Sequence, residues 1–348
     1  MNRIIKKIVL PPLYILMRAF AIAESGLLVV TYHRICDKPD LDDTLKVSQI
    51  TFEKQIEYLQ NKYNIISGEE LEVIAQGKKV LRPNSCMITF DDGWSDNYHL
   101  AFPILKKYHV PAIIFLSADF IGTHKIFWHE RLAEWLMRAD ITDFHSDNNS
   151  ELKPYVANSI AGILAKPTKY RRPYVDELVE SLKQYRNDKI ENMFEDIGLT
   201  ENGIGHTLPA MLSWEQVREM SAHGIEFGSH GSSHNILTLL SEAEVEKELI
   251  TSAEIIERNI GKKPRMIAYP NGNYNNEILK IAEASGYIFG FTCNHGINTI
   301  SGKCLTIKRR HIGEDVTLGF NHQFSQLFFE IELSGARDYL IKWKQYSH

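Results

Sequence analysis

Short apolar runs that alternate with helical segments constrain the fold of this chain more than any other sequence feature. Seven runs are predicted to be buried strands, because they are short, apolar and rich in branched or aromatic side chains. They cover residues 27–32, 87–90, 112–116, 225–228, 266–269, 288–292 and 305–309. Two intervening segments begin with capping boxes, Ser213 with Gln216 and Ser241 with Glu244. The alternation predicts an α/β protein whose strand ends deliver polar residues to one rim.

The run at residues 87–90 ends in two adjacent carboxylates, Asp91 and Asp92, which Gly93 follows. Adjacent residues that leave a strand point in opposite directions, so one carboxylate could bind a cation while the other faces a substrate. Gly93 lets the backbone turn sharply beside them. Asp-Asp-Gly is also favourable turn chemistry, so an ordinary turn remains the alternative for this segment alone.

The run at residues 225–228 leads directly into His230 and His234. Histidines four residues apart lie on one face of a helical turn or compact loop, where both can bind one metal ion. One carboxylate from the Asp91–Asp92 pair would complete a set of two imidazoles and one carboxylate. This set, with an open position for water, is typical of catalytic metal centres.

Three motifs occur in a fixed order along the chain: TFDDG at residues 89–93, HGSSH at 230–234 and AYPNG at 268–272. Together they resemble the motifs of the polysaccharide deacetylase family, also called carbohydrate esterase family four. TYHRI at residues 31–35 resembles the first strand of many members. The resemblance covers roughly residues 25–320. It implies a distorted (β/α) barrel of about seven strands and metal-dependent removal of acetyl groups from amino sugars.

Carried onto this sequence, the resemblance implies that Asp92 and both motif-two histidines bind the metal and that Asp91 is the catalytic base. A divalent metal would activate water and polarise the acetyl carbonyl. The donor set favours Zn²⁺ and leaves Co²⁺, Ni²⁺ or Fe²⁺ open. The oxyanion that forms needs a backbone N–H donor. The resemblance assigns this donor to Asn271, which follows Pro270.

The third motif departs from the family pattern Arg-x-Pro-Tyr, whose arginine orients the catalytic aspartate, because Ala268 stands in the arginine's place. The segment at residues 307–312 (IKRRHI) offers a replacement, since strand alternation would put Arg309 and His311 on one face. Arg309 is therefore predicted to pair with Asp91, and His311 to protonate the leaving amine. The family's last motif, Leu-x-His, is matched only in part, because His311 supplies the histidine but Arg309 stands in place of the leucine. The alternative is a basic rim without a role.

Two further residues are candidates for the substrate side of the rim. His33 follows the first run and either lines the site or caps the strand. Trp94 follows the aspartates and either stacks on a sugar ring or packs in the wall of the barrel mouth. The remaining histidines are expected to be structural or on the surface, among them His99, His109, His129 and His145.

The alternation stops between residues 123 and 212, where only amphipathic helices are expected. This segment is interpreted as a helical insertion between two parts of the barrel, residues 25–122 and 213–322. It either shapes the substrate cleft or elaborates the surface. A C-terminal helix is predicted within residues 323–348.

Residues 1–24 form an apolar segment with basic residues, and Pro11 and Pro12 interrupt the apolar run. The two prolines and Arg18 disfavour a cleaved signal, and the run is too short to span a bilayer. The segment either rests on a membrane surface or forms a helix that covers the bottom of the barrel. Four cysteines without metal-site spacing favour a reducing compartment. The predicted location is therefore the cytoplasm, with the inner membrane surface as an option, rather than the periplasm or the outside of the cell.

The net charge of −5 gives no basic footprint for nucleic acid. The expected partner is an N-acetylated glycan or a lipid-linked sugar. The leading hypothesis is an N-deacetylase of a surface polysaccharide or its lipid-linked precursor. An O-acetyl esterase, or another C–N hydrolase with the same site, is the alternative among enzymes. A catalytically silent carbohydrate-binding barrel is disfavoured, because both aspartates and both histidines are present.

Overall fold

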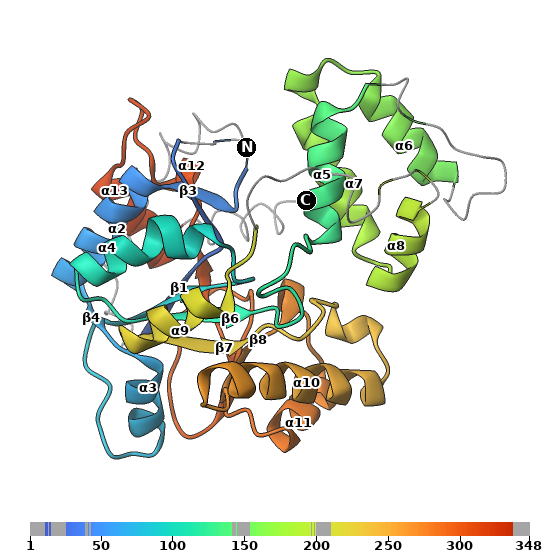
Figure 1. Ribbon diagram of the computed structural model, residues 1–348. Helices are drawn as coiled ribbons and strands as arrows, with labels where there is room; N and C mark the ends of the chain where they lie inside the picture. Colours follow the sequence, from blue (N-terminus) through green and yellow to red (C-terminus); the bar gives the residue numbers. More distant parts are fainter. Residues whose placement is uncertain are drawn as a thin grey trace, which may run out of the picture.

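The architecture consists of a curled sheet wrapped by helices and a second group of helices beside it (Figure 1). It is a computed structural model that describes residues 26–38, 43–140, 154–195 and 210–336. It also describes a few isolated residues, namely 11, 12, 14, 41, 144, 197 and 199.

Eight parallel strands form the main sheet in the order β10-β9-β8-β7-β6-β5-β1-β11, and β4 (Asn64–Ile65) pairs with β5 beside this path. The eight are β1 (Leu27–Tyr32), β5 (Ser85–Phe90), β6 (Ala112–Leu116), β7 (Ile225–Ser229), β8 (Met266–Ala268), β9 (Phe289–Phe291), β10 (Cys304–Ile307) and β11 (Arg310–His311). Every residue of β1, β5 and β6 is buried, because helices and the barrel interior cover both faces. Each predicted run contains a strand, although the last run ends earlier than expected.

The sheet closes on itself through its last two strands. β10 and β11 occupy opposite edges, yet only Lys308 and Arg309 separate them in the chain. Three residue steps reach at most about 11 Å, so the two edges must meet. Asn298 holds this seam, because its amide donates to the carbonyl oxygens of Leu27 (3.1 Å) and Lys308 (2.8 Å). The sheet is therefore a barrel that lacks strand pairing at one seam, which confirms the predicted distorted (β/α) barrel.

Helices cover the outside of the barrel, as Figure 1 shows. They are α2 (Gln49–Lys62), α3 (Gly68–Ala75), α4 (Phe102–Lys107), α9 (Trp214–Ala222), α10 (Glu242–Ile260), α11 (Asn276–Ala284), α12 (Glu314–Thr317) and α13 (Gln326–Ser334). Both predicted capping boxes are present, at the first turns of α9 and α10. A small two-stranded sheet, β2 (Arg34–Cys36) with β3 (Lys46–Ser48), lies next to α2 and α12.

Four helices make up the described part of the predicted insertion: α5 (Trp128–Arg138), α6 (Pro154–Leu164), α7 (Arg172–Leu182) and α8 (Asn187–Glu195). Figure 1 shows them in green as a separate group beside the barrel. They share an apolar core of their own, which includes Leu132, Ile160 and Leu178. The buried Arg171 closes this core, because its guanidinium donates to the carbonyl oxygens at the ends of α5 and α6.

Sequence predictions at both chain ends extend beyond the described residues. Within the predicted C-terminal helical segment, α13 ends at Ser334, because Gly335 adopts a left-handed conformation with φ of 74°. Residues 337–348 lie outside the described part of the chain, as do residues 1–24 apart from 11, 12 and 14, so the predicted membrane contact stays a prediction. Among the helices that the structure describes, none combines the length and apolar character needed to cross a membrane.

Candidate active site

The carboxyl ends of the parallel strands meet at one rim and bring the separate motifs together. Asp91 and Asp92 follow β5, His230 follows β7, and Arg309 lies between β10 and β11. Their side chains line one cavity of about 460 Å³. This is the end of a (β/α) barrel at which enzymes place their chemistry.

Asp92, His230 and His234 form a group that could hold a metal ion, with donor atoms within 4.8 Å of one another. Asp92 Oδ1 lies 3.5 Å from His230 Nε2 and 3.4 Å from His234 Nε2. Neighbouring groups orient two of these donors. His230 Nδ1–H donates to the Ala268 carbonyl (2.8 Å), which leaves Nε2 unprotonated toward the site, and Trp94 Nε1 donates to Asp92 Oδ2 (2.8 Å). The donor set therefore fits a divalent ion such as Zn²⁺.

Burial and charge hold two of these ligands in the protonation states that metal binding requires. Burial lowers the pKa of His230 to about 4, so its imidazole is neutral at pH 7. Burial alone would raise the pKa of Asp92. The hydrogen bond and charge of His234 outweigh this effect and hold the pKa of that carboxyl well below its usual range.

Two of these three candidate ligands have an uncommon backbone conformation, since Asp92 has φ of 76° and His234 has φ of 57°. Left-handed backbone at non-glycine residues costs roughly 1–3 kcal/mol each and persists only where neighbouring contacts enforce it. For the motif-two loop, the buried Glu248 of α10 supplies such contacts. Its carboxylate accepts from the Ser233 N–H (2.6 Å) and from the hydroxyls of Ser232 and Ser233 (each 2.9 Å).

Glu248→Ala is expected to weaken zinc binding about 10- to 100-fold, as the loss of groups that orient metal ligands does. The substitution leaves both serines without their acceptor and releases the loop that carries His234. Competition with a chromogenic chelator would measure the zinc affinity. Glu246→Ala, at an exposed position of the same helix, is the matched control. Equal zinc affinity in the two folded variants would contradict the role of Glu248.

Arg309 and Asp91 form a buried, bidentate ion pair. Arg309 Nη1 donates to Asp91 Oδ1 (2.6 Å), and Nη2 donates to Oδ2 (2.7 Å). Arg309 is fixed in turn, because it also donates to the Thr31 hydroxyl (3.1 Å) and the Thr292 carbonyl (3.0 Å). Burial alone would raise the pKa of Asp91, but the charge of Arg309 outweighs it and lowers that pKa below its usual value. Asp91 is therefore an oriented carboxylate beside the metal-ligand group.

Residues 78–290, more than half of the chain, match the family described as polysaccharide deacetylase. The chain belongs to the polysaccharide deacetylase family. The motifs at residues 89–93, 230–234 and 268–272 lie within the matched region and converge on the rim described above. The first strand, β1, and the last strands, β10 and β11, lie outside the matched region.

Two relatives are similar to this chain in sequence, and one solved structure is similar to it in fold. YxkH of Bacillus subtilis is 26% identical over 269 residues, which are 77% of this chain and 64% of YxkH. The poly-beta-1,6-N-acetyl-D-glucosamine N-deacetylase of Staphylococcus epidermidis is 24% identical over 283 residues, 77% of this chain and 73% of that enzyme. IcaB from Ammonifex degensii shares the fold with a TM-score of 0.56 at 19% identity, covering 90% of this chain and 97% of IcaB. The chain thus spans slightly less than two thirds of YxkH.

Arg309, the predicted replacement for the motif-three arginine, does not lie within a regular strand. β10 ends at Ile307 and β11 begins at Arg310, so Arg309 lies in the seam. The predicted ion pair with Asp91 is nevertheless present. Arg309 and Arg310 are both buried, which excludes the alternative of an exposed basic rim at these positions.

His33 and His311 line the same cavity of the deacetylase barrel. Their rings pack edge to face with centroids 5.2 Å apart, and His33 Nε2 lies 3.9 Å from Asp91 Oδ2. His311 Nε2–H donates to the Thr44 carbonyl (2.8 Å), so Nδ1 is the nitrogen left to exchange a proton. Burial lowers the pKa of His311 to about 4, and the ring is therefore neutral at pH 7.

Trp94 does not offer a surface for sugar stacking, which corrects one of the two readings of this residue. It is only 2% exposed, with the Arg34 guanidinium 4.2 Å from its ring centroid and the Phe127 ring packed edge-on at 5.3 Å. The turn after β5 directs the indole inward, where its N–H binds Asp92. Trp94 therefore supports a predicted metal ligand rather than the substrate.

Pro270 and Asn271 form a short 3-10 turn, Pro270–Gly272, after β8, and Asn271 lines the cavity. Asn271 and Gly272 are both left-handed, with φ of 57° and 73°. A Cβ atom at Gly272 would lie 2.8 Å from the backbone nitrogen of Cys293, so only glycine fits there. This tight packing fixes the loop that the family resemblance assigns to the oxyanion.

Several cavity residues outside the family motifs were not assigned to the site from the sequence, among them His129, Lys183 and Cys293. His129 was expected to be structural or at the surface. It opens α5, stacks on Phe127 and lies 5.8 Å from the His234 ring, centroid to centroid. Burial lowers the pKa of His129 to about 3, so this ring is neutral. No spacing in the sequence links these positions to the motifs, because the insertion and the seam loop reach the site only through the fold.

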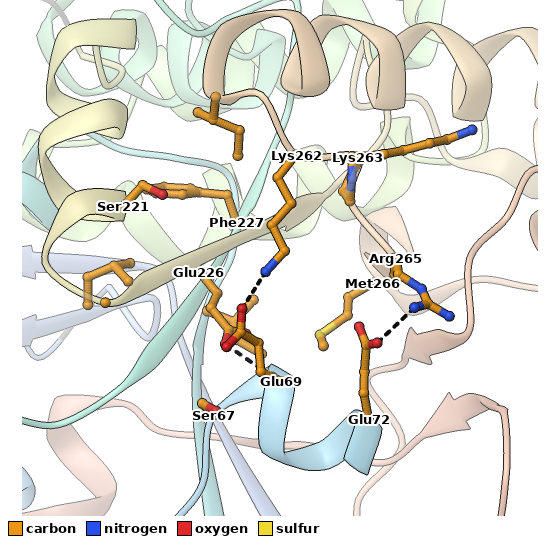
Figure 2. A pocket seen from close by; sticks show the side chains of 15 residues that line it. Ser67, Glu69, Glu72, Ser221, Glu226, Phe227, Lys262, Lys263, Arg265 and Met266 are labelled. Carbon is orange, nitrogen blue, oxygen red and sulfur yellow. Dashed lines mark hydrogen bonds and ion pairs between the residues drawn. The ribbon is translucent and has the colours of Figure 1, made fainter. Parts of the chain in front are cut away.

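A second cavity of about 340 Å³ lies at the amino ends of the strands and is shown in Figure 2. Lys262 donates to Glu69 (2.6 Å) and Arg265 to Glu72 (2.9 Å), while Glu226 accepts from the Glu69 N–H (3.1 Å). These charges pair with one another and fasten α3 to the loop that precedes β8. They are structural contacts, and the deacetylase motifs all lie at the opposite end of the barrel.

Proposed function

We propose that this protein is a metal-dependent hydrolase that removes the N-acetyl group from an amino sugar. Its substrate is a surface polysaccharide or the lipid-linked precursor of one. The observation that carries the proposal is the placement of the Asp91–Arg309 pair directly beside Asp92, His230 and His234 in one cavity. An oriented base next to a metal-ligand group is the arrangement that hydrolysis of an acetyl amide requires.

The residues around the cavity divide the chemistry among them. When bound to Asp92, His230 and His234, a divalent ion would activate a water molecule and polarise the acetyl carbonyl. Asp91 accepts a proton from the attacking water, while Arg309 holds both carboxylate oxygens in place. The backbone N–H of Asn271 donates to the oxyanion that develops on the acetyl group.

Proton delivery to the leaving amine falls to His311, through Nδ1. Because the pKa of His311 is lowered to about 4, the ring lacks this proton at the start of the reaction. His33 contacts both Asp91 and the His311 ring. It offers the route by which the proton taken by Asp91 reaches the amine, so that protons balance over one turnover.

A screen of acetate release tests the substrate class. Zinc-loaded protein would be incubated with N-acetylglucosamine oligomers, an O-acetylated glycan and a lipid-linked N-acetyl sugar. Acetate is expected from the N-acetylated substrates, in line with the name of the Staphylococcus epidermidis relative. Release from the O-acetylated glycan alone would replace this proposal with an esterase. No release from any substrate by protein that holds the ion would indicate a carbohydrate-binding barrel.

A further inference from the structure

The turn that joins α7 to α8, residues 183–187, reaches from the helical insertion to two loops of the barrel rim. One of these loops carries Asn271 and the other carries His234. The two loops follow different strands, β8 and β7. A short segment that contacts both can set their positions relative to each other.

Lys183 holds the first loop. Its ammonium group donates to Asn271 Oδ1 (3.0 Å), while Asn271 Nδ2 donates to Asn273 Oδ1 (2.7 Å). The Asn271 amide is thus held at both ends, at a residue whose left-handed backbone needs such support. Lys183 also pairs with Glu180 (2.8 Å) on α7, which fixes the position of the ammonium group. Its side chain lines the cavity.

Asn187 holds the second loop. Its side-chain amide donates to the carbonyl oxygens of Ser233 (3.2 Å) and His234 (3.4 Å), and its backbone N–H donates to Asn235 Oδ1 (3.4 Å). Glu248 binds the same loop from α10. The loop that presents His234 is therefore held between the insertion and the barrel.

The turn is anchored on the barrel between these two contacts. Arg186 donates through Nη2 and Nη1 to the two carboxylate oxygens of Glu244 (2.7 and 3.1 Å), in the first turn of α10. Glu244 also closes the capping box of that helix with Ser241. Because the bidentate geometry restricts both side chains, the turn has a defined orientation over the rim.

We infer that the α7–α8 turn is a positioning element of the active site, with Asn187 orienting the His234 loop and Lys183 orienting the Asn271 loop. The insertion thereby completes the site rather than only decorating the surface. The part that concerns Lys183 rests on the proposed function. The part that concerns Asn187 does not, because metal affinity can be measured without a substrate.

The Asn187 contact is tested by zinc affinity. Asn187→Leu, which keeps the size of the side chain but removes its donor, is expected to weaken zinc binding about tenfold. Asn187→Ala is a second variant, which serves as the test if the leucine variant fails to fold. It is expected to show the same loss of zinc affinity. Gln184→Ala is the matched control, since, among the residues that the structure describes, the Gln184 side chain hydrogen-bonds to the Ser181 carbonyl of the insertion and not to the barrel loops. Wild-type zinc affinity in folded Asn187 variants would overturn this part of the inference.

The Lys183 contact is tested by steady-state kinetics at saturating zinc. Lys183→Met is expected to lower kcat about tenfold with KM changed less than twofold, because a misplaced oxyanion donor affects the transition state more than substrate binding. Zinc affinity should stay unchanged, and Lys183→Arg should restore most of kcat by replacing the donor. An unchanged kcat in Lys183→Met would overturn the part of the inference that concerns Lys183. If the wild-type protein binds zinc but releases no acetate, the proposed function fails, and the zinc affinities of the Asn187 variants still decide this inference.

Discussion

His230→Ala and His234→Ala are each expected to lose the bound metal and to reduce acetate release to background. Each substitution removes one of three protein ligands, and two donors rarely retain a divalent ion. The loss should be severe for His230, which is 2% exposed, because the substitution removes its Nε2 together with the hydrogen bond from Nδ1 to the Ala268 carbonyl.

Metal content by mass spectrometry, together with acetate release, would measure this effect. His99→Ala is the control, because His99 is an exposed histidine on the barrel surface. His230→Ala and His234→Ala should each contain far less metal than this control after identical purification. Full metal content in both variants would contradict the assignment of the ligands.

Asp91→Asn is expected to slow hydrolysis by about 10²–10⁴-fold while the metal is retained, because asparagine keeps the shape of the carboxylate but cannot take a proton. The variant also leaves the buried Arg309 without its counter-ion, and breaking a buried pair costs about 3–5 kcal/mol of folding stability. Activity must therefore be measured well below the unfolding temperature of the variant.

A double variant separates the loss of chemistry from the loss of stability. Asp91→Asn combined with Arg309→Gln should regain part of the unfolding temperature, because no buried charge is left unpaired, yet it should remain inactive. Asp92→Asn is the complementary change and should weaken metal binding instead. If Asp91→Asn alone removed the metal, the roles of the two aspartates would have to be exchanged.

The parts of the site that lie next to strand ends could be predicted from the sequence. Apolar runs before Asp91 and His230 predict strands, and parallel strands bring their carboxyl ends to one rim. The motif residues therefore had to meet, whatever the intervening chain does. The same local logic predicted the capping boxes of α9 and α10.

The position of Arg309 was predicted from a local sequence pattern, but it results from the closure of the barrel. Strand alternation predicted that Arg309 would face Asp91, and the ion pair is present although no regular strand runs through this residue. The reason lies in the seam: β11 pairs with β1, which in turn pairs with β5, so the residue before β11 lies close to the end of β5. Closure of the barrel, which no local pattern encodes, places Arg309 there.

Contacts between segments that are distant in the chain could not be predicted from the sequence. Trp94 follows the aspartates as a sugar-stacking residue would, but long-range packing by Phe127 and Arg34 buries it. His129, Lys183 and Asn187 belong to the insertion, whose amphipathic pattern predicts helices but not the direction in which their polar faces point. Their positions depend on how the helical group sits against the barrel.

Zinc titration of metal-free protein tests the central claim most directly. Protein stripped with a chelator would be titrated with Zn²⁺ while acetate release from N-acetylglucosamine oligomers and bound zinc are followed together. The account predicts no release without metal, and a rate that rises in proportion to bound zinc and levels off at about one ion per chain, as a single three-ligand site requires. Acetate release that is independent of bound metal would contradict it.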